Sequence, residues 1–318
     1  MAEIEAPDAE NPYLVIIRAD GVNDSLDNID DEIVKLLYIE HGAVLFRGFN
    51  LSIENFGRLA KCFTTHATLN ESRNREMLCD ENRVQTVALG GAPFPLHPEL
   101  SRRPWKPDVC FFGCLNPPSV GGETTICDGT LIAEGLPNEL RQTFEGRRLM
   151  YMEKALPKLL EFWVGSETPS VEELARPQPN CPLKFARVGS DIASTYVVPV
   201  LHKTMFSDAL AWGNFLFFNR YLQKRRNFPV FANGEEISDD LVDAVKAIAD
   251  RYEYSVKWQK GDVLMLDNTR FMHGRKAVDL TDGREIITYF GYLKFAIPGP
   301  DELPNAIWRD SDRWTLEL

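Results

Sequence analysis

The segment PFPLHPEL, residues 93–100, contains His97, one of only five histidines in the chain, and Glu99 two positions later. On a β-strand, positions i and i+2 project from the same face, so both side chains could reach one metal ion. Acidic residues are frequent here, with 47 Asp and Glu among 318 residues. A chance pairing in a surface loop is therefore an equal alternative for this segment alone.

A second histidine in a different setting strengthens the metal hypothesis. His273 lies in DNTRFMHGR, residues 267–275, at the end of a strand-like run. Two imidazoles and one carboxylate form a facial triad that leaves half of an octahedron open, which suits Fe(II) chemistry with O₂ and an oxidising cosubstrate. A Zn(II)- or Mn(II)-dependent hydrolase or isomerase could use the same three ligands and stays open at this point.

Two further residues could bind the distant carboxylate of a keto acid. Arg284 follows a predicted turn at Thr281–Gly283, which would return the chain toward His273. Its guanidinium offers a planar fork that matches a carboxylate. Thr124, in VGGETTICDG, could donate its hydroxyl hydrogen to the same group. Taken alone, Arg284 could be a surface arginine at a hairpin end, and Thr124 could belong to an ordinary turn.

The composition is that of an ordinary globular protein, with 44% hydrophobic and 26% charged residues. A net charge of −12 without a long basic block argues against nucleic-acid binding. We find neither a signal peptide nor an apolar stretch of roughly 18 residues, so we expect a cytoplasmic protein that does not enter a membrane. The six cysteines form no CxxC pair, and we expect free thiols.

The hydrophobic pattern predicts a β-rich core with helices packed outside it. Helices are expected over 30–42, with Gly42 as C-cap, over 53–63 after Ser52, and over 238–252; strands are expected over 43–49, 107–115 and 284–295. Residues 153–200 contain many Pro, Glu and Ser residues and show no clear periodicity. We therefore expect a mobile lid or an insertion there.

HPE at 97–99, GGETTICD at 121–128, DNTRFMHGR and Arg284 together resemble the taurine dioxygenase-like (TauD/TfdA) superfamily of Fe(II)/2-oxoglutarate-dependent oxygenases. The resemblance extends from about residue 40 to 296. It implies an α+β fold with a double-stranded β-helix (jelly-roll or cupin-like) core and flanking helices. We expect one oxygenase domain over 1–318, with an insertion or lid within 140–235, a segment that matches no motif we can name.

The same resemblance assigns roles to individual residues. It implies that His97, Glu99 and His273 are the catalytic iron ligands, and that Thr124 and Arg284 hold the C5 carboxylate of 2-oxoglutarate. Fe(II), 2-oxoglutarate and O₂ are then the expected cofactor and cosubstrates. The implied reaction is oxidation, most simply hydroxylation, of an unactivated C–H bond, with release of succinate and CO₂.

Two departures from the common family pattern bear on the substrate. Glu99 replaces the commoner Asp, which resembles the clavaminate synthase-like branch with its amino-acid hydroxylases; its presence argues against halogenation. Some members carry a second arginine four positions after the first, where this chain has Thr288. That difference puts in doubt the binding of a strongly acidic group. We therefore expect a small amino acid or an amino-acid-derived natural-product intermediate.

Three residues are candidates for substrate contact. Thr68 and Asn70 lie in a loop over 65–76, where family members place such contacts, and a plain surface loop is the alternative. Arg275 could face the pocket with His273 and bind a carboxylate, or it could pair with an acid elsewhere. A small-molecule substrate is the one partner that the sequence indicates, and it leaves the oligomeric state open.

Overall fold

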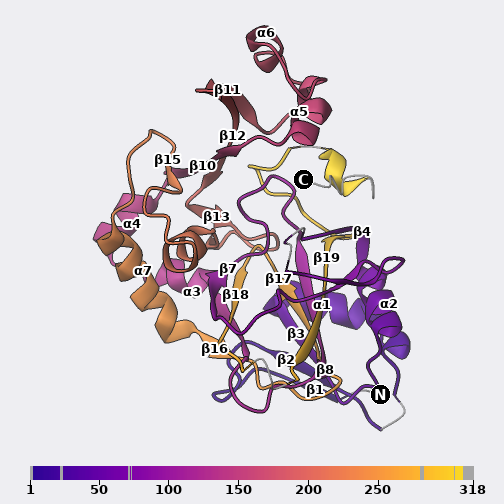
Figure 1. The fold of residues 1–318 in the computed structure, drawn as a ribbon. Helices are drawn as coiled ribbons and strands as arrows, with labels where there is room; N and C mark the ends of the chain where they lie inside the picture. Colours follow the sequence, from indigo (N-terminus) through magenta and orange to yellow (C-terminus); the bar gives the residue numbers. More distant parts are fainter. Residues whose placement is uncertain are drawn as a thin grey trace.

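Two β-sheets packed face to face form the centre of the protein (Figure 1). The computed structural model describes residues 3–21, 24–70, 72, 74–279, 283–303 and 305–310. The large sheet has the order β1-β2-β3-β17-β8-β19-β6-β5, with β4 also paired to β19. Its strands are β1 (Glu3–Glu5), β2 (Val15–Arg18), β3 (Ala43–Arg47), β4 (Thr64–Thr68), β5 (Met77–Cys79), β6 (Val84–Thr86), β8 (Val109–Asn116), β17 (Val263–Asp267) and β19 (Glu285–Leu293).

The small sheet carries the candidate site and has the order β16-β9-β18-β7. Its strands are β7 (Phe94–His97), β9 (Thr124–Asp128), β16 (Tyr254–Ser255) and β18 (Phe271–Arg275). All its pairings are antiparallel, and His273 of β18 lies in register with His97 of β7. The register therefore brings two histidines that are far apart in the sequence side by side.

Strand β8 shows how the two-residue period builds the core. Cys110, Phe112 and Cys114 point into the apolar layer between the two sheets, as a two-residue period requires. Val109 and Phe111 point the other way, into a second apolar layer. Both faces are buried, so the strand is apolar along nearly its whole length.

Helices α1 (Asp31–His41) and α2 (Ile53–Phe63) contribute buried side chains to this second layer, on the outer face of the large sheet (Figure 1). Their predicted ends are confirmed. Gly42 ends α1 in the left-handed conformation, and Ser52 begins α2 with a capping box to Asn55. Cys127 and Met272 of the small sheet pack into a third apolar layer with α3 (Gly129–Glu134), α4 (Asn138–Phe144) and α7 (Asp239–Tyr252).

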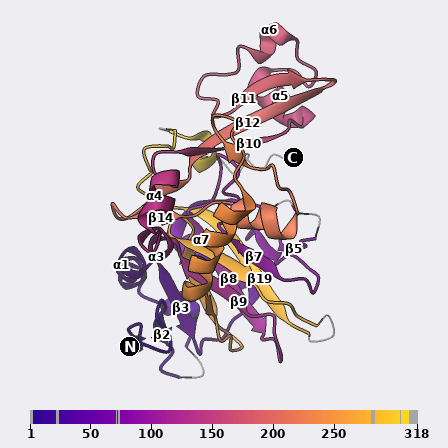
Figure 2. The same cartoon turned by 90° about the vertical axis from the view of Figure 1, so that its left-hand side faces the viewer.

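A further four-stranded sheet, ordered β11-β12-β10-β15, lies beyond the two central sheets. With two short helices it forms an arm that projects from them in both views (Figures 1 and 2). Its elements are β10 (Arg148–Lys154), α5 (Pro157–Val164), α6 (Val171–Leu174), β11 (Lys184–Val188), β12 (Asp191–Pro199) and β15 (Val230–Phe231). Residues 153–200 thus contain regular elements that the sequence pattern does not indicate.

The remaining elements are short: η1 (Leu26–Asn28), β13 (Leu201–Lys203), β14 (Leu210–Trp212), η2 (Phe218–Leu222) and η3 (Ile307–Arg309). All six cysteines have free thiols, as expected. Within the described part of the chain, no helix has the length and apolar character needed to cross a membrane.

Phe111→Ala should lower the free energy of unfolding by about 3–5 kcal/mol, because it opens a cavity at the centre of the large sheet. The Phe111 ring is fully buried and lies 6.4 Å from the ring of Phe63 and 6.1 Å from that of Tyr289. Urea unfolding measures the change. Leu36→Ala, at a side chain 65% exposed on α1, is the control and should change stability by less than about 0.5 kcal/mol.

Candidate metal centre

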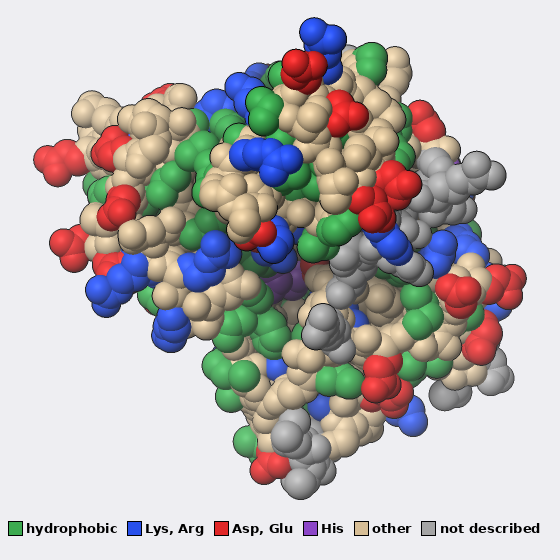
Figure 3. Space-filling view, turned by 45° about the horizontal axis from the view of Figure 1, so that its top comes forward, with side chains coloured by type: hydrophobic (Ala, Val, Ile, Leu, Met, Phe, Trp, Pro, Cys, Tyr) green, Lys and Arg blue, Asp and Glu red, His purple; other side chains and the backbone are tan. Residues whose placement is uncertain are grey.

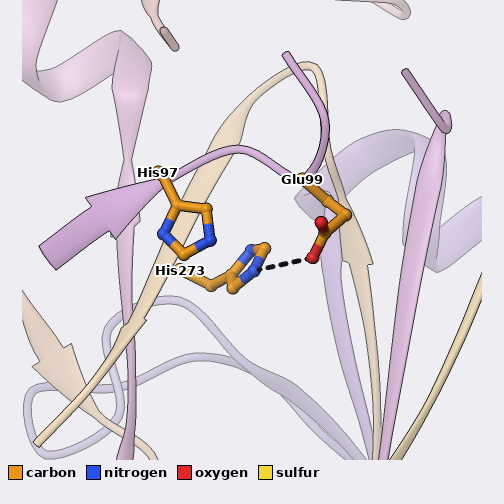
Figure 4. A group of neighbouring side chains, drawn as sticks. All are labelled: His97, Glu99 and His273. Carbon is orange, nitrogen blue, oxygen red and sulfur yellow. Dashed lines mark ion pairs between the residues drawn. The ribbon is translucent and has the colours of Figure 1, made fainter. Parts of the chain in front are cut away.

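His97, Glu99 and His273 converge on one point of the small sheet (Figure 4). Each offers one ligand atom, and these atoms lie within 4.8 Å of one another. His97 ends β7 and His273 lies in β18, whereas Glu99 stands in the turn that follows β7. The expectation that a single strand carries His97 and Glu99 is therefore wrong, although their side chains do meet.

The hydrogen bonds of His97 leave one ring nitrogen for a metal. Nδ1 lies 2.8 Å from the carbonyl oxygen of Pro95, and a carbonyl can only accept. The proton must therefore sit on Nδ1, which leaves the lone pair on Nε2. Burial, together with the nearby His273, lowers the pKa of His97 to about 3, so the ring is neutral at physiological pH.

Glu99 is ionised although only 2% of it is exposed. Burial raises the pKa of its carboxyl group, but the Arg75 guanidinium and the ring of His273 together outweigh this effect. The resulting pKa is about 2, below the ordinary value. Since metal ligands must be deprotonated to bind, His97 and Glu99 already stand in the form that a cation requires.

The donor set fits a divalent ion. The Nε2 atom of His273 lies 3.6 Å from Oε2 of Glu99, too far for a hydrogen bond. The other ring nitrogen of His273, Nδ1, is buried without a hydrogen-bond partner among the described residues. A buried imidazole pointing at a carboxylate across such a gap is poorly satisfied by itself, and an ion held between the ligand atoms would satisfy both groups.

Two side chains from the loop before β5 hold the Glu99 carboxylate. Asn70 donates from Nδ2 to Oε1 at 2.6 Å, and Arg75 donates from Nη2 to Oε2 at 3.3 Å. The guanidinium also reaches Thr288 at 3.1 Å. Arg75 lies in a loop without periodicity, so no pattern in the sequence indicates it, whereas Asn70 is predicted from the sequence to contact the substrate. The structure shows Asn70 against the candidate ligand.

Asn268, in the DNTRF segment, fixes the backbone of Glu99. Its side-chain oxygen accepts from the Glu99 N–H at 2.7 Å, and its Nδ2 donates to the Glu99 carbonyl at 3.0 Å. The same Nδ2 donates to the carbonyl of Pro107 at 2.8 Å, so a side chain 1% exposed makes all these bonds. Because Glu99 lies outside a strand, this amide takes over the role of ladder hydrogen bonds.

The three candidate ligands line a cavity of about 200 Å³. In the space-filling view a histidine side chain is visible at the bottom of a hollow (Figure 3). Phe94, Phe112, Phe215 and Phe218 supply apolar wall, and both Thr124 and Arg284 line the same cavity. The structure therefore brings together all five residues predicted to bind metal or keto acid.

Thr124 begins β9, and its hydroxyl is oriented by Trp258, a residue that the sequence does not point to. The indole N–H of Trp258 donates to Oγ1 of Thr124 at 3.0 Å. A hydroxyl that accepts this bond keeps its own hydrogen for a ligand oxygen. Trp258 follows β16, and no local sequence signal relates it to Thr124.

Arg284 directly precedes β19 and packs against Gly122 of the GGETTICD segment. Its Nε donates to the carbonyl of Gly122 at 2.7 Å. Gly122 has φ +67°, and a Cβ there would lie 3.0 Å from Cδ of Arg284 and 2.8 Å from Val278. Only glycine allows this approach. In the predicted turn before Arg284, Thr281 and Asp282 lie outside the described residues.

The other candidates for substrate contact differ in position. Arg275 lines the cavity, but its guanidinium donates to the carbonyls of Ala88, Gly90 and Ala92 at 2.6–2.7 Å. Backbone carbonyl groups thus hold Arg275, and not the acidic residue that the sequence analysis gave as its alternative partner. Thr68 is buried in β4 and is not among the described residues that line the cavity.

Asn70→Ala should weaken metal binding by about 10-fold or more, because groups that orient a ligand typically contribute 10- to 100-fold to metal affinity. A titration with Mn(II), monitored by electron paramagnetic resonance, measures the metal affinity without turnover. Ser72→Ala is the control, since Ser72 lines the same cavity and contacts Asn70 through its backbone N–H. An unchanged metal affinity with a raised substrate KM would instead support the substrate role predicted from the sequence.

A double-stranded β-helix with a buried His/Glu/His cluster is the arrangement typical of non-haem Fe(II) oxygenases. The family model described as taurine catabolism dioxygenase TauD, TfdA family matches residues 17–288. The chain therefore belongs to this family, and it is an Fe(II)/2-oxoglutarate-dependent oxygenase. The predicted fold class and enzyme class are confirmed, which sets aside the hydrolase and isomerase alternative.

Individual relatives agree with this assignment. The chain is 24% identical over 326 residues to dapdiamide synthesis protein DdaC of Enterobacter agglomerans, covering 93% of this chain and 95% of the relative. It is 24% identical over 260 residues to a clavaminate synthase-like protein of Arabidopsis thaliana, covering 76% and 79%. The fold is similar to that of PvcB, an Fe, α-ketoglutarate dependent oxygenase from an isonitrile synthetic pathway, with TM-score 0.57, 14% identity and 94% of each chain covered. A second structure of PvcB, from Pseudomonas aeruginosa, matches with TM-score 0.56 at the same identity and coverage.

Proposed function

We propose that this oxygenase hydroxylates an unactivated C–H bond of a small amino acid or of an amino-acid-derived natural-product intermediate. The observation that carries the proposal is that His97, Glu99 and His273 line the same cavity as Thr124 and Arg284. Two relatives bear names from natural-product chemistry, dapdiamide synthesis and an isonitrile synthetic pathway. The Glu ligand and the clavaminate synthase-like relative favour an amino-acid scaffold.

In this proposal, His97, Glu99 and His273 hold Fe(II) through two nitrogens and one oxygen. When bound, the ion with 2-oxoglutarate and O₂ supplies the oxidation: one oxygen atom enters the C–H bond, and the other enters succinate as CO₂ leaves. Asn70 and Arg75 keep the carboxylate of Glu99 oriented toward the ion.

Thr124 and Arg284 orient the keto acid from its other end. Arg284 offers a guanidinium fork to the C5 carboxylate, and Thr124 donates its hydroxyl hydrogen to the same group. The contact of Arg284 with Gly122 and the bond from Trp258 to Thr124 preorganise both donors. Phe112, Phe215 and Phe218 line the cavity with apolar surface and limit water near the reacting bond.

The test is a screen of amino acids and their N-acylated derivatives with the Fe(II)-loaded enzyme under air. We expect at least one compound to raise succinate release above the substrate-free rate and to gain the mass of one oxygen atom. Succinate release that no compound stimulates would count against the amino-acid substrate class. A product lacking two hydrogens, in place of one with added oxygen, would replace hydroxylation by desaturation or cyclisation.

A further inference from the structure

The cavity carries more positive charge than the keto acid needs. Arg75, Arg102, Arg275 and Arg284 all line it, whereas Glu99 is the one carboxylate among the described lining residues. The charges of an Fe(II) ion and a 2-oxoglutarate dianion cancel each other, so the excess of positive charge in the cavity is unchanged when both are bound. Such a cavity favours an anionic substrate.

The four arginines differ in what occupies their guanidinium groups. Arg75 is bound to Glu99 and Arg275 to backbone carbonyls, while Arg284 belongs to the keto-acid site proposed above. Arg102 donates from Nη1 to Oε1 of Glu153 at 2.6 Å, and its other N–H groups have no partner among the described residues. A guanidinium has five N–H donors, so Arg102 retains several for a ligand.

Arg102 is also near the reacting centre. Its guanidinium lies 5.5 Å from the centre of the Phe215 ring, and that ring lies 5.2 Å from the imidazole of His97. Phe218 packs against both rings, 4.5 Å from Phe215 and 4.9 Å from His97. One layer of aromatic side chains therefore separates Arg102 from the candidate metal ligand.

We propose that Arg102 binds a carboxylate of the substrate, while the apolar part of the substrate lies along Phe215 and Phe218 toward His97. The inference rests on the proposed function and narrows it to substrates that carry a free carboxylate. The bidentate geometry of a guanidinium suits this group better than an uncharged amide.

Glu153, on β10 of the arm, holds Arg102 in place. Its two oxygens bind two arginines, Arg102 at 2.6 Å and Arg103 at 3.0 Å. Arg103 is not among the described residues that line the cavity. The two arginines thus share one carboxylate, but of the two only Arg102 lines the cavity. Substitutions of Arg102 and of Arg103 therefore form a matched pair of variants.

The test measures binding of N-acetyl-L-amino acids and of the corresponding N-acetyl amino-acid amides to anaerobic protein loaded with Fe(II) and 2-oxoglutarate. Calorimetry gives the dissociation constants of wild type, Arg102→Gln and Arg103→Gln. We expect the best carboxylate to bind wild type at least about 10-fold more tightly than its amide, because hydrogen bonds between ionised partners are about twice as strong as neutral ones. Arg102→Gln should remove this preference, and Arg103→Gln should keep it.

Two results would overturn the inference. One is a wild type that binds no carboxylate better than its amide; the other is an equal effect of the two substitutions, which would point to the structural pairing with Glu153. The visible band of the Fe(II)/2-oxoglutarate complex, recorded on the same samples, separates this inference from the proposed function. If the band forms normally in Arg102→Gln, the keto-acid site is intact whatever the binding data show.

Discussion

Glu99→Ala is expected to lower the affinity for Fe(II) by at least about 100-fold and to abolish succinate release. The variant loses the carboxylate of the candidate ligand set, and even groups that merely orient a ligand contribute 10- to 100-fold to affinity. Metal binding is measured by Mn(II) titration under anaerobic conditions, and succinate release is measured with excess Fe(II).

The same substitution should destabilise the metal-free protein by about 3 kcal/mol, because it leaves the buried guanidinium of Arg75 without its carboxylate. Glu76→Ala removes an exposed carboxylate from the neighbouring loop and is the control for both effects. Wild-type metal affinity in Glu99→Ala would show that Glu99 is not a ligand.

Arg284→Ala is expected to raise the dissociation constant of 2-oxoglutarate by about 30-fold or more, since truncating one partner of a buried charge pair costs about 2–5 kcal/mol. Fe(II) affinity should change little, because Arg284 is not one of the three candidate ligands. Anaerobic titration of the iron-loaded variant with 2-oxoglutarate gives the dissociation constant.

Conservative variants distinguish charge from geometry at this end of the cavity. Arg284→Lys keeps the charge but loses the planar fork, so its affinity for 2-oxoglutarate should lie between those of wild type and Arg284→Ala. Thr124→Ser keeps the hydroxyl that Trp258 orients and should bind 2-oxoglutarate within a few-fold of wild type. Unchanged binding in Arg284→Ala would remove Arg284 from the proposed keto-acid site.

The parts of the fold with local signals are predictable from the sequence. Ser52 and Gly42 mark helix ends that the structure confirms, because capping depends on a few neighbouring residues. The alternation in β8 likewise places Cys110 and Cys114 on one face. The convergence of His97 with His273 follows from the family resemblance, since no local rule predicts which strands pair.

What the sequence misses depends on contacts between distant segments. Asn268 bonds to the backbone of Glu99, and Trp258 to the hydroxyl of Thr124, across sequence separations of more than a hundred residues. Arg75 belongs to a loop whose conformation is set by its partners rather than by its own pattern. Within 153–200, α6 has only four residues and β11 is exposed along most of its length, so neither element leaves a clear period in the sequence.

The visible spectrum of anaerobic protein, titrated first with Fe(II) and then with 2-oxoglutarate for wild type and Arg284→Ala, tests directly whether the five residues bind iron and keto acid together. We expect a weak charge-transfer band that appears only when both are present, and that requires higher 2-oxoglutarate concentrations in the variant. Stoichiometric Fe(II) binding without any band in the wild type would contradict this expectation.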